Sequence, residues 1–140
     1  MTIIIQNVVR LIVPFILMFG AYVTVYGHVS PGGGFAGGTI LAAALILERF
    51  VGINRKWSLN KSTCLKGVSF SLVGYGILKG IAFLEGAMHI ELIHWPLGQP
   101  GALFSAGIIP LLNILIGLVV MMAFVLLFDL FNEDLAGEDH

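Results

Sequence analysis

The chain has 140 residues, 58 % of them apolar, and its 8 acidic and 7 basic side chains give a net charge of -1. The charged fraction of 11 % is about half that of an ordinary soluble domain, which is too little to cover a water-soluble globule. This composition argues against a cytosolic enzyme, a nucleic-acid-binding protein and a disordered chain. It predicts an all-α integral membrane protein whose spans, at roughly 20 residues each, leave no room for a cofactor-binding soluble domain.

Glycine and proline residues divide the apolar sequence into four predicted transmembrane helices. As one helix, the uncharged run 11–47 would be about 55 Å long, nearly twice the hydrocarbon thickness, so it must fold back at Pro31 and the three glycines that follow. Pro14 and Pro110 fall inside the first and fourth helices, and we expect an irregularity near Pro110. The predicted helices cover residues 8–26, 35–53, 66–86 and 104–128, and the acidic tail 129–140 is expected to be solvated and partly disordered.

The basic residues predict the orientation of these spans. They gather around the connection between the second and third helices, at Arg49, Arg55, Lys56, Lys61 and Lys66, and the other two connections have none. By the positive-inside rule this connection faces the cytoplasm, so both termini are cytoplasmic and the glycine-rich turn lies outside. No basic residue precedes Arg10, so the first helix is expected to be retained rather than cleaved as a signal. The chain is therefore predicted to cross the membrane several times, with the basic connection on the cytoplasmic side.

Small residues recur at helical spacing in two of the predicted helices. Gly34, Gly38 and Ala42 are four apart in the second helix, and Gly76 and Gly80 repeat the spacing in the third. In lipid such stripes let another helix backbone approach closely. They indicate either packing within this chain or docking to other subunits.

Lys79 is a charged residue placed deep in a predicted span. It lies about 13 residues, or about 20 Å, from the cytoplasmic start of the third helix, where a lysine costs about 2.5 kcal/mol or more. Glu48, in the second helix, differs from it in depth by about 10 Å. Glu85 follows it by six residues, a spacing that does not bring two side chains to one helix face. Lys79 therefore either reaches outward to Glu85 and water, or meets a carboxylate or a hydrated path in another protein.

Two further polar residues have open interpretations. Asn113 lies in the apolar middle of the fourth helix and acts either as hydrogen-bonding glue between helices or as part of an ion path. His28 is either a solvated loop residue or a proton relay, since histidine changes charge near neutral pH. The candidate ion-pathway residues are His28, Glu48, Lys79, Glu85 and Asn113.

No metal, cofactor or catalytic site is predicted. Carboxylates and imidazoles in the outer connection, at Glu85, His89, Glu91 and His94, lack a strong ligand pattern, although they could form a proton-accessible vestibule. The single cysteine, Cys64, has no partner for a disulfide and is interpreted as a bystander. No arrangement of residues supports a catalytic nucleophile or a phosphate-binding loop.

The turn between the first two helices has the strongest local signature, GHVSPGGGFAGG at residues 27–38. Ser30 can cap the second helix with Pro31 at its first position. The glycines exceed what a cap needs, so they either form an anion-binding nest or let a neighbouring helix press against the turn.

This run closely resembles the GHxxPGGGFxGG signature of the B subunit of Mrp-type multisubunit cation/proton antiporters, the MnhB-like family. The likeness covers essentially the whole chain, including the lysine in the third helix. By resemblance, the motif positions are Gly27, His28, Pro31, Gly32, Gly33, Gly34, Phe35, Gly37 and Gly38.

The resemblance implies a non-catalytic subunit of a membrane complex that exchanges Na⁺ for H⁺ beside other antiporter subunits. Near the fourth helix, many bacterial members read something like GTPLLFDIGVYLVVLG, whereas this chain reads GQPGALFSAGIIPLLN from Gly98. That form looks nearer to versions built into redox-driven complexes such as archaeal membrane-bound hydrogenases and sulfane-sulfur reductases. A purely structural subunit is a further alternative. A small multidrug exporter is disfavoured, because such exporters resemble one another in an acidic residue that the first helix lacks here.

Overall fold

A computed structural model describes residues 3–27, 32–53, 60–88 and 107–137 of the chain. In these ranges the protein consists of α-helices and has no strand: α1 (Ile3–Val25), α2 (Gly33–Phe50), α3 (Lys61–Met88) and α4 (Ile109–Gly137). All 4 helices are long and apolar enough to cross a membrane. The predicted all-α architecture with four spans is therefore confirmed.

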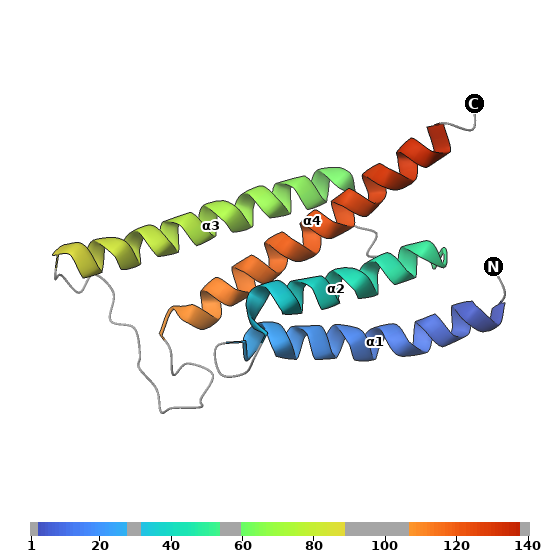
Figure 1. The fold of residues 1–140 in the computed structure, drawn as a ribbon, viewed down its shortest axis with the longest axis horizontal. Coiled ribbons are helices and arrows are strands. Elements are labelled where there is room, and N and C mark those ends of the chain that lie inside the picture. Colours follow the sequence, from blue (N-terminus) through green and yellow to red (C-terminus); the bar gives the residue numbers. More distant parts are fainter. Residues whose placement is uncertain (1–2, 28–31, 54–59, 89–106, 138–140) are drawn as a thin grey trace.

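Successive helices run in opposite directions (Figure 1). The start of α1, the end of α2, the start of α3 and the end of α4 lie toward one end of the bundle, as four consecutive spans require. α2 packs between α1 and α4, and α3 packs along the other side of α4. Which end faces the cytoplasm stays a prediction.

Two apolar clusters hold the described helices together. Val9 and Val13 of α1 pack with Ala44 and Val51 of α2. The second cluster joins three helices through Ala42 of α2, Cys64 of α3 and Val125 of α4. Burial is uneven among the helices. In an apolar stretch of 18 residues, 33 % of the residues of α2 are buried, but only 6 % of those of α3. Helix α3 is thus the least enclosed member of the bundle.

The helix ends differ from those predicted. Helix α3 begins at Lys61 rather than at residue 66, and α4 continues past residue 128 to Gly137, so this part of the acidic tail is helical. Pro110 is the second residue of α4, in the first turn, where its missing N–H would have no helical partner. The predicted place of Pro110 in the interior of the fourth helix is therefore wrong, although the chain does turn just before it, where Gly107 has φ 57°.

The start of α2 also corrects a prediction. Its N-cap is Gly32, which makes no side-chain cap hydrogen bond, so the predicted cap at Ser30 with Pro31 in the first helical position is wrong. Gly32 has φ 153° and Gly33 has φ 77°, backbone conformations that side chains disfavour. These two glycines are therefore required by the path of the chain into α2. Residues 28–31 themselves, including His28, lie outside the described ranges.

Candidate functional site

The glycine motif forms the contact between α2 and α4. A Cβ atom built on Gly34 would lie 2.2 Å from the backbone oxygen of Asn113, and one on Gly38 would lie 2.6 Å from that of Gly117. Real Cβ atoms do not approach other atoms so closely, so only glycine fits at these two positions. Gly34 and Gly38 stand four residues apart on α2, as do Asn113 and Gly117 on α4. Two parallel helix backbones therefore touch along a seam of small residues.

The same motif receives α1 on its other side. A Cβ atom on Gly37 would lie 2.0 Å from Oγ1 of Thr24, and one on Gly20 would lie 2.9 Å from the side chain of Leu41. The Thr24 hydroxyl donates a 2.8 Å hydrogen bond to the Gly20 carbonyl, which satisfies this buried hydroxyl within α1. At Gly27, the added Cβ would lie 2.4 Å from the Cα atom of Gly33. Close approach of another backbone segment thus explains Gly27, Gly34, Gly37 and Gly38, whereas positive φ angles explain Gly32 and Gly33.

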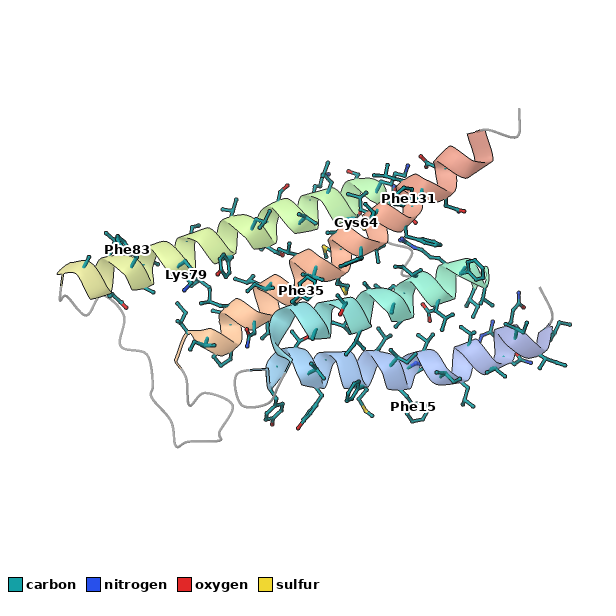
Figure 2. All side chains as sticks on the ribbon, in the orientation of Figure 1. Phe15, Phe35, Cys64, Lys79, Phe83 and Phe131 are labelled. Atoms are coloured by element: carbon teal, nitrogen blue, oxygen red, sulfur yellow. The ribbon has the colours of Figure 1, made fainter. Side chains whose placement is uncertain are left out.

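Beside this junction lies an apolar pocket of about 190 Å³. Residues of α1, α2 and α4 line it: Ala21, Thr24, Val25, Leu41, Ile114, Gly117 and Leu118. None of these described lining side chains is ionisable. Phe35 differs from the motif glycines, because its ring is 61 % exposed rather than packed into the junction (Figure 2).

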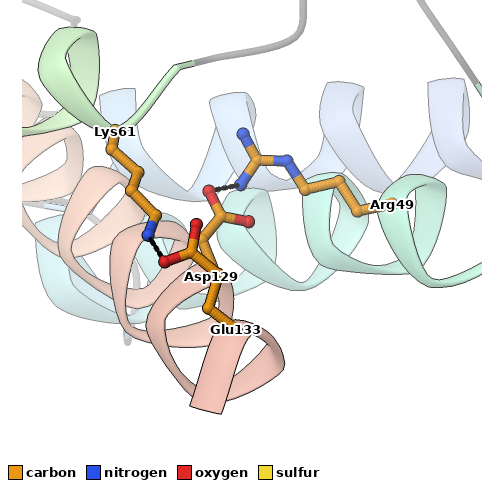
Figure 3. Close-up of polar contacts among 4 residues, drawn as sticks. All are labelled: Arg49, Lys61, Asp129 and Glu133. Atoms are coloured by element: carbon orange, nitrogen blue, oxygen red, sulfur yellow. Dashed lines mark hydrogen bonds and ion pairs between the residues drawn. The ribbon is translucent and has the colours of Figure 1, made fainter. Parts of the chain in front are cut away.

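At the opposite end of the bundle, two ion pairs join three helices (Figure 3). Nη1 of Arg49 on α2 donates to Oδ2 of Asp129 on α4 at 2.7 Å, and both side chains are about four-fifths buried. Lys61 of α3 pairs with Glu133 of α4. We call these four residues the ion-pair layer. Sequence reasoning missed this layer, because Arg49 and Asp129 are 80 residues apart.

The predicted ion-pathway residues do not gather in one site. Glu48 is 7 % exposed and lies next to Arg49, near the ion-pair layer. Asn113 packs against Gly34, which is 14 residues, or about 21 Å, from Glu48 along α2. Among the described residues, none forms a hydrogen bond with the side-chain amide of Asn113. Glu85 lies on α3, three residues before its end.

Lys79 is exposed on α3 and forms no ion pair with any described residue. Helix α3 packs on α4 with Gly67 against Met122 and Gly74 against Leu115. Continuing this antiparallel register places Lys79 level with Pro110. Pro110 is 19 residues, or about 28 Å, from Asp129, which is close to one hydrocarbon thickness. Lys79 therefore lies toward the end of the bundle opposite the ion-pair layer. It is 18 residues, or about 27 Å, from the start of α3 at Lys61, farther than the sequence estimate of about 20 Å.

His89, Glu91 and His94, which the sequence places in a connection predicted to be on the outer side, lie outside the described ranges. Cys64 is a free thiol, fully buried between α2 and α4. Among the described residues, no three His, Cys, Asp or Glu side chains come together as a metal-binding group.

Comparison with known proteins identifies a family and several similar proteins. Residues 4–126 match the family described as a domain related to the MnhB subunit of Na⁺/H⁺ antiporters. An uncharacterized protein of Methanocaldococcus jannaschii is 37 % identical over 103 residues, which are 68 % of this chain and 38 % of that protein. A Staphylococcus aureus protein named as antiporter subunit mnhB2 is 47 % identical over 45 residues, 32 % of each chain.

A solved structure is also similar. One chain of the membrane-bound sulfane sulfur reductase, an archaeal respiratory membrane complex, superposes with a TM-score of 0.71 at 27 % identity. The match covers 91 % of this chain and 56 % of that one. The chain thus spans between about a third and rather more than half of the length of these relatives.

Four helices long and apolar enough to cross a membrane, packed as one bundle, define a multi-pass helical membrane protein. More particularly, the match over nearly the whole sequence shows that this chain belongs to the family related to the MnhB subunit of Na⁺/H⁺ antiporters.

Proposed function

We propose that this chain is a non-catalytic membrane subunit of an Mrp-type module that exchanges Na⁺ for H⁺ across the cytoplasmic membrane of a prokaryote. The observation that carries the proposal is the family match over residues 4–126. The partners are other antiporter subunits, which hold the chain in a hetero-oligomeric complex within the bilayer. The exposure of α3 supports such partners, since only 6 % of the residues in its apolar stretch are buried by this chain.

Within the module, we assign the chain two tasks: a lipid-buried subunit interface and one wall of a hydrated ion route. The buried carboxylate of Glu48 supports the second task, because ionisable residues within spans commonly mark ion and proton pathways. His28, Lys79, Glu85 and Asn113 are the other residues proposed for this route. Because Glu48 lies near the ion-pair layer while Lys79, Glu85 and Asn113 lie toward the opposite end of the bundle, the route also needs groups from neighbouring subunits.

Everted membrane vesicles test the transport function. Respiration acidifies their lumen, and added Na⁺ then collapses the pH gradient if the complex exchanges the two ions. We expect a strain that lacks this chain to lose Na⁺-induced recovery of a pH-sensitive dye, and expression of the full chain to restore it. The same assay with K⁺ and Li⁺ identifies the cation. Unchanged Na⁺-dependent exchange without the chain would contradict the proposal.

The structural similarity to the sulfane sulfur reductase complex favours a second candidate function. In that case the same module is coupled to a redox-driven complex, such as a hydrogenase or a sulfane reductase, instead of working as a free-standing antiporter. Purification through a tag on this chain in mild detergent separates the two. Co-purifying redox subunits support the redox-driven complex, and their absence from a complex that retains Na⁺/H⁺ exchange supports the antiporter.

A purely structural subunit is the third candidate, in which helix contacts are the whole function. The packing of the motif glycines by itself fits this role. Variants at the ion-route residues distinguish a structural subunit from an ion-route subunit. If the chain is purely structural, these variants leave transport normal as long as the complex assembles.

A further inference from the structure

The C-terminal half of α3 has an outward face that no described residue covers. Cβ atoms built on Gly76 and Gly80 would meet no atom within 4 Å. Nearby, Val73 is 61 % exposed, Ile77 58 % and Phe83 73 %. Figure 2 shows Lys79 and Phe83 on the part of α3 that extends past the ends of α1 and α2. We call residues 73–84 of this face the α3 surface.

The α3 surface contrasts with the exposed face of α1. Helix α1 presents large apolar side chains, with Leu11 67 %, Phe15 62 % and Met18 67 % exposed, and this face suits lipid. The α3 surface instead combines glycines with a lysine. At the corresponding glycines of α2, Gly34 and Gly38, the backbone of α4 occupies the space that a side chain would need. The structure thus leaves open, on α3, the kind of contact that α2 makes within the chain.

Lipid alone cannot satisfy both Lys79 and the apolar residues beyond it. If the membrane boundary lies at Glu85, Lys79 sits in hydrocarbon about 9 Å below it, and the Cα–Cβ bond tilts its side chain toward the helix start and so toward the membrane interior. If the boundary lies at Lys79, Phe83 and Leu84 stand exposed to water at 73 % and 46 %. A protein surface that is apolar and carries a carboxylate satisfies both.

A second copy of this chain does not supply that surface. A two-fold symmetric contact between two α3 surfaces would bring Lys79 of one copy next to Lys79 of the other, and like charges at low dielectric repel. The positive charge of Lys79 is instead complemented by an acidic side chain of a partner at the same level of the membrane.

We propose that the α3 surface binds a transmembrane helix of a different subunit, and that this helix carries an Asp or Glu at the level of Lys79 and packs against Gly76 and Gly80. This inference rests on the proposed role as a subunit of a complex, but not on which ions the complex moves.

Photo-crosslinking in the intact complex tests the contact. The photoreactive residue p-benzoylphenylalanine replaces Phe83, the full complex is irradiated in native membranes, and mass spectrometry identifies the linked peptides. The expected product joins position 83 to a transmembrane peptide of another subunit that contains Asp or Glu. Linkage only to lipid, to a second copy of this chain, or to residues 89–106 of the same chain would overturn the proposal.

Charge variants test the acidic partner. Lys79→Glu should lower the yield of this crosslink about tenfold or more, whereas Lys79→Arg should retain it. The matched control is Lys66→Glu, which reverses the other exposed lysine of α3 outside the proposed surface and should leave the yield unchanged. Replacing the linked carboxylate by Lys should restore crosslinking to Lys79→Glu. An equal yield for Lys79→Glu and the unmodified chain contradicts the ion pair.

Steric variants complete the test. A Cβ atom at Gly80 would meet no atom within 4 Å, so we expect Gly80→Leu to be recovered folded in detergent, but the crosslink should be lost. Retention of the crosslink in folded Gly80→Leu would exclude close packing at this glycine. Because every readout is a contact, this proposal and the transport proposal fail separately: loss of Na⁺/H⁺ exchange without loss of the crosslink affects only the latter.

Discussion

Gly38 of α2 and Gly117 of α4 bring two helix backbones into direct contact, since a single methyl group on Gly38 would lie 2.6 Å from the Gly117 carbonyl oxygen. Lipid tails are as apolar as the side chains, so there is little hydrophobic force between helices in a membrane, and close packing takes its place. This contact makes the seam between α2 and α4 intolerant of side-chain volume.

Gly38→Ala should therefore destabilise the folded bundle. The added methyl group must push α2 and α4 apart, and overpacking of this kind typically costs about 1–3 kcal/mol. Thermal unfolding of the detergent-solubilised protein, followed by tryptophan fluorescence or circular dichroism, measures the loss. The matched control is Gly76→Ala, whose methyl group meets no described atom and should be neutral or stabilising by up to about 1 kcal/mol.

The comparison of Gly38→Ala with Gly76→Ala separates the effect of the seam from that of helix propensity, because both substitutions add the same methyl group to a glycine in a membrane-spanning helix. Equal effects on unfolding would show that helix propensity, rather than the seam, determines stability.

These two glycines also illustrate what the sequence can predict. The spacing of Gly34, Gly38 and Ala42 matches that of Gly76 and Gly80, and both patterns predict a packing face. Only the fold distinguishes them, because α2 lies between two helices while α3 packs along α4 on one side. Small-residue spacing identifies a contact face but contains no information about which helix fills it.

The ion pair between Arg49 and Asp129 should contribute more to stability than the pair between Lys61 and Glu133. Both members of the first pair are about four-fifths buried, whereas Glu133 is 67 % exposed and strongly screened by solvent. Asp129→Asn should cost about 1–2 kcal/mol, because it removes the carboxylate charge that faces the partly buried guanidinium of Arg49. Glu133→Gln should cost at most about 0.5 kcal/mol.

Detergent unfolding measures both variants, and an exchange of charges supplies the control. The double variant Arg49→Asp with Asp129→Arg should recover part of the stability lost in either single variant. If Asp129→Asn and Glu133→Gln unfold alike, burial of the first pair has no energetic consequence.

This pair shows a second limit of sequence reasoning. The composition and the apolar runs predict four spans, and the charges at the ends of those runs predict where the spans stop. The pairing of Arg49 with Asp129 depends on α4 lying beside α2, an association between non-consecutive helices that hydropathy does not specify. For the same reason the sequence predicts a solvated acidic tail, whereas Asp129 and Glu133 pair with basic residues of α2 and α3.

Cysteine accessibility tests the predicted orientation of the bundle. The only cysteine of the sequence, Cys64, is fully buried, so the unmodified chain should give little reaction with a membrane-impermeant maleimide. Ser62→Cys and Ala87→Cys place exposed thiols near opposite ends of α3. If the basic connection is cytoplasmic, intact cells should label Ala87→Cys and everted vesicles should label Ser62→Cys. The reverse pattern would invert the topology.

Replacement of Lys79 separates an ion-route role from a structural one. Lys79→Met keeps the length of the side chain but removes the charge, so under the ion-route proposal Na⁺/H⁺ exchange in everted vesicles should fall about tenfold or more, with assembly retained. Lys66→Met removes the other exposed lysine of α3, near the ion-pair layer, and should leave exchange unchanged. Recovery of all subunits through a tag on this chain establishes assembly for each variant. Normal exchange by an assembled Lys79→Met complex would remove Lys79 from the ion route and favour the structural subunit.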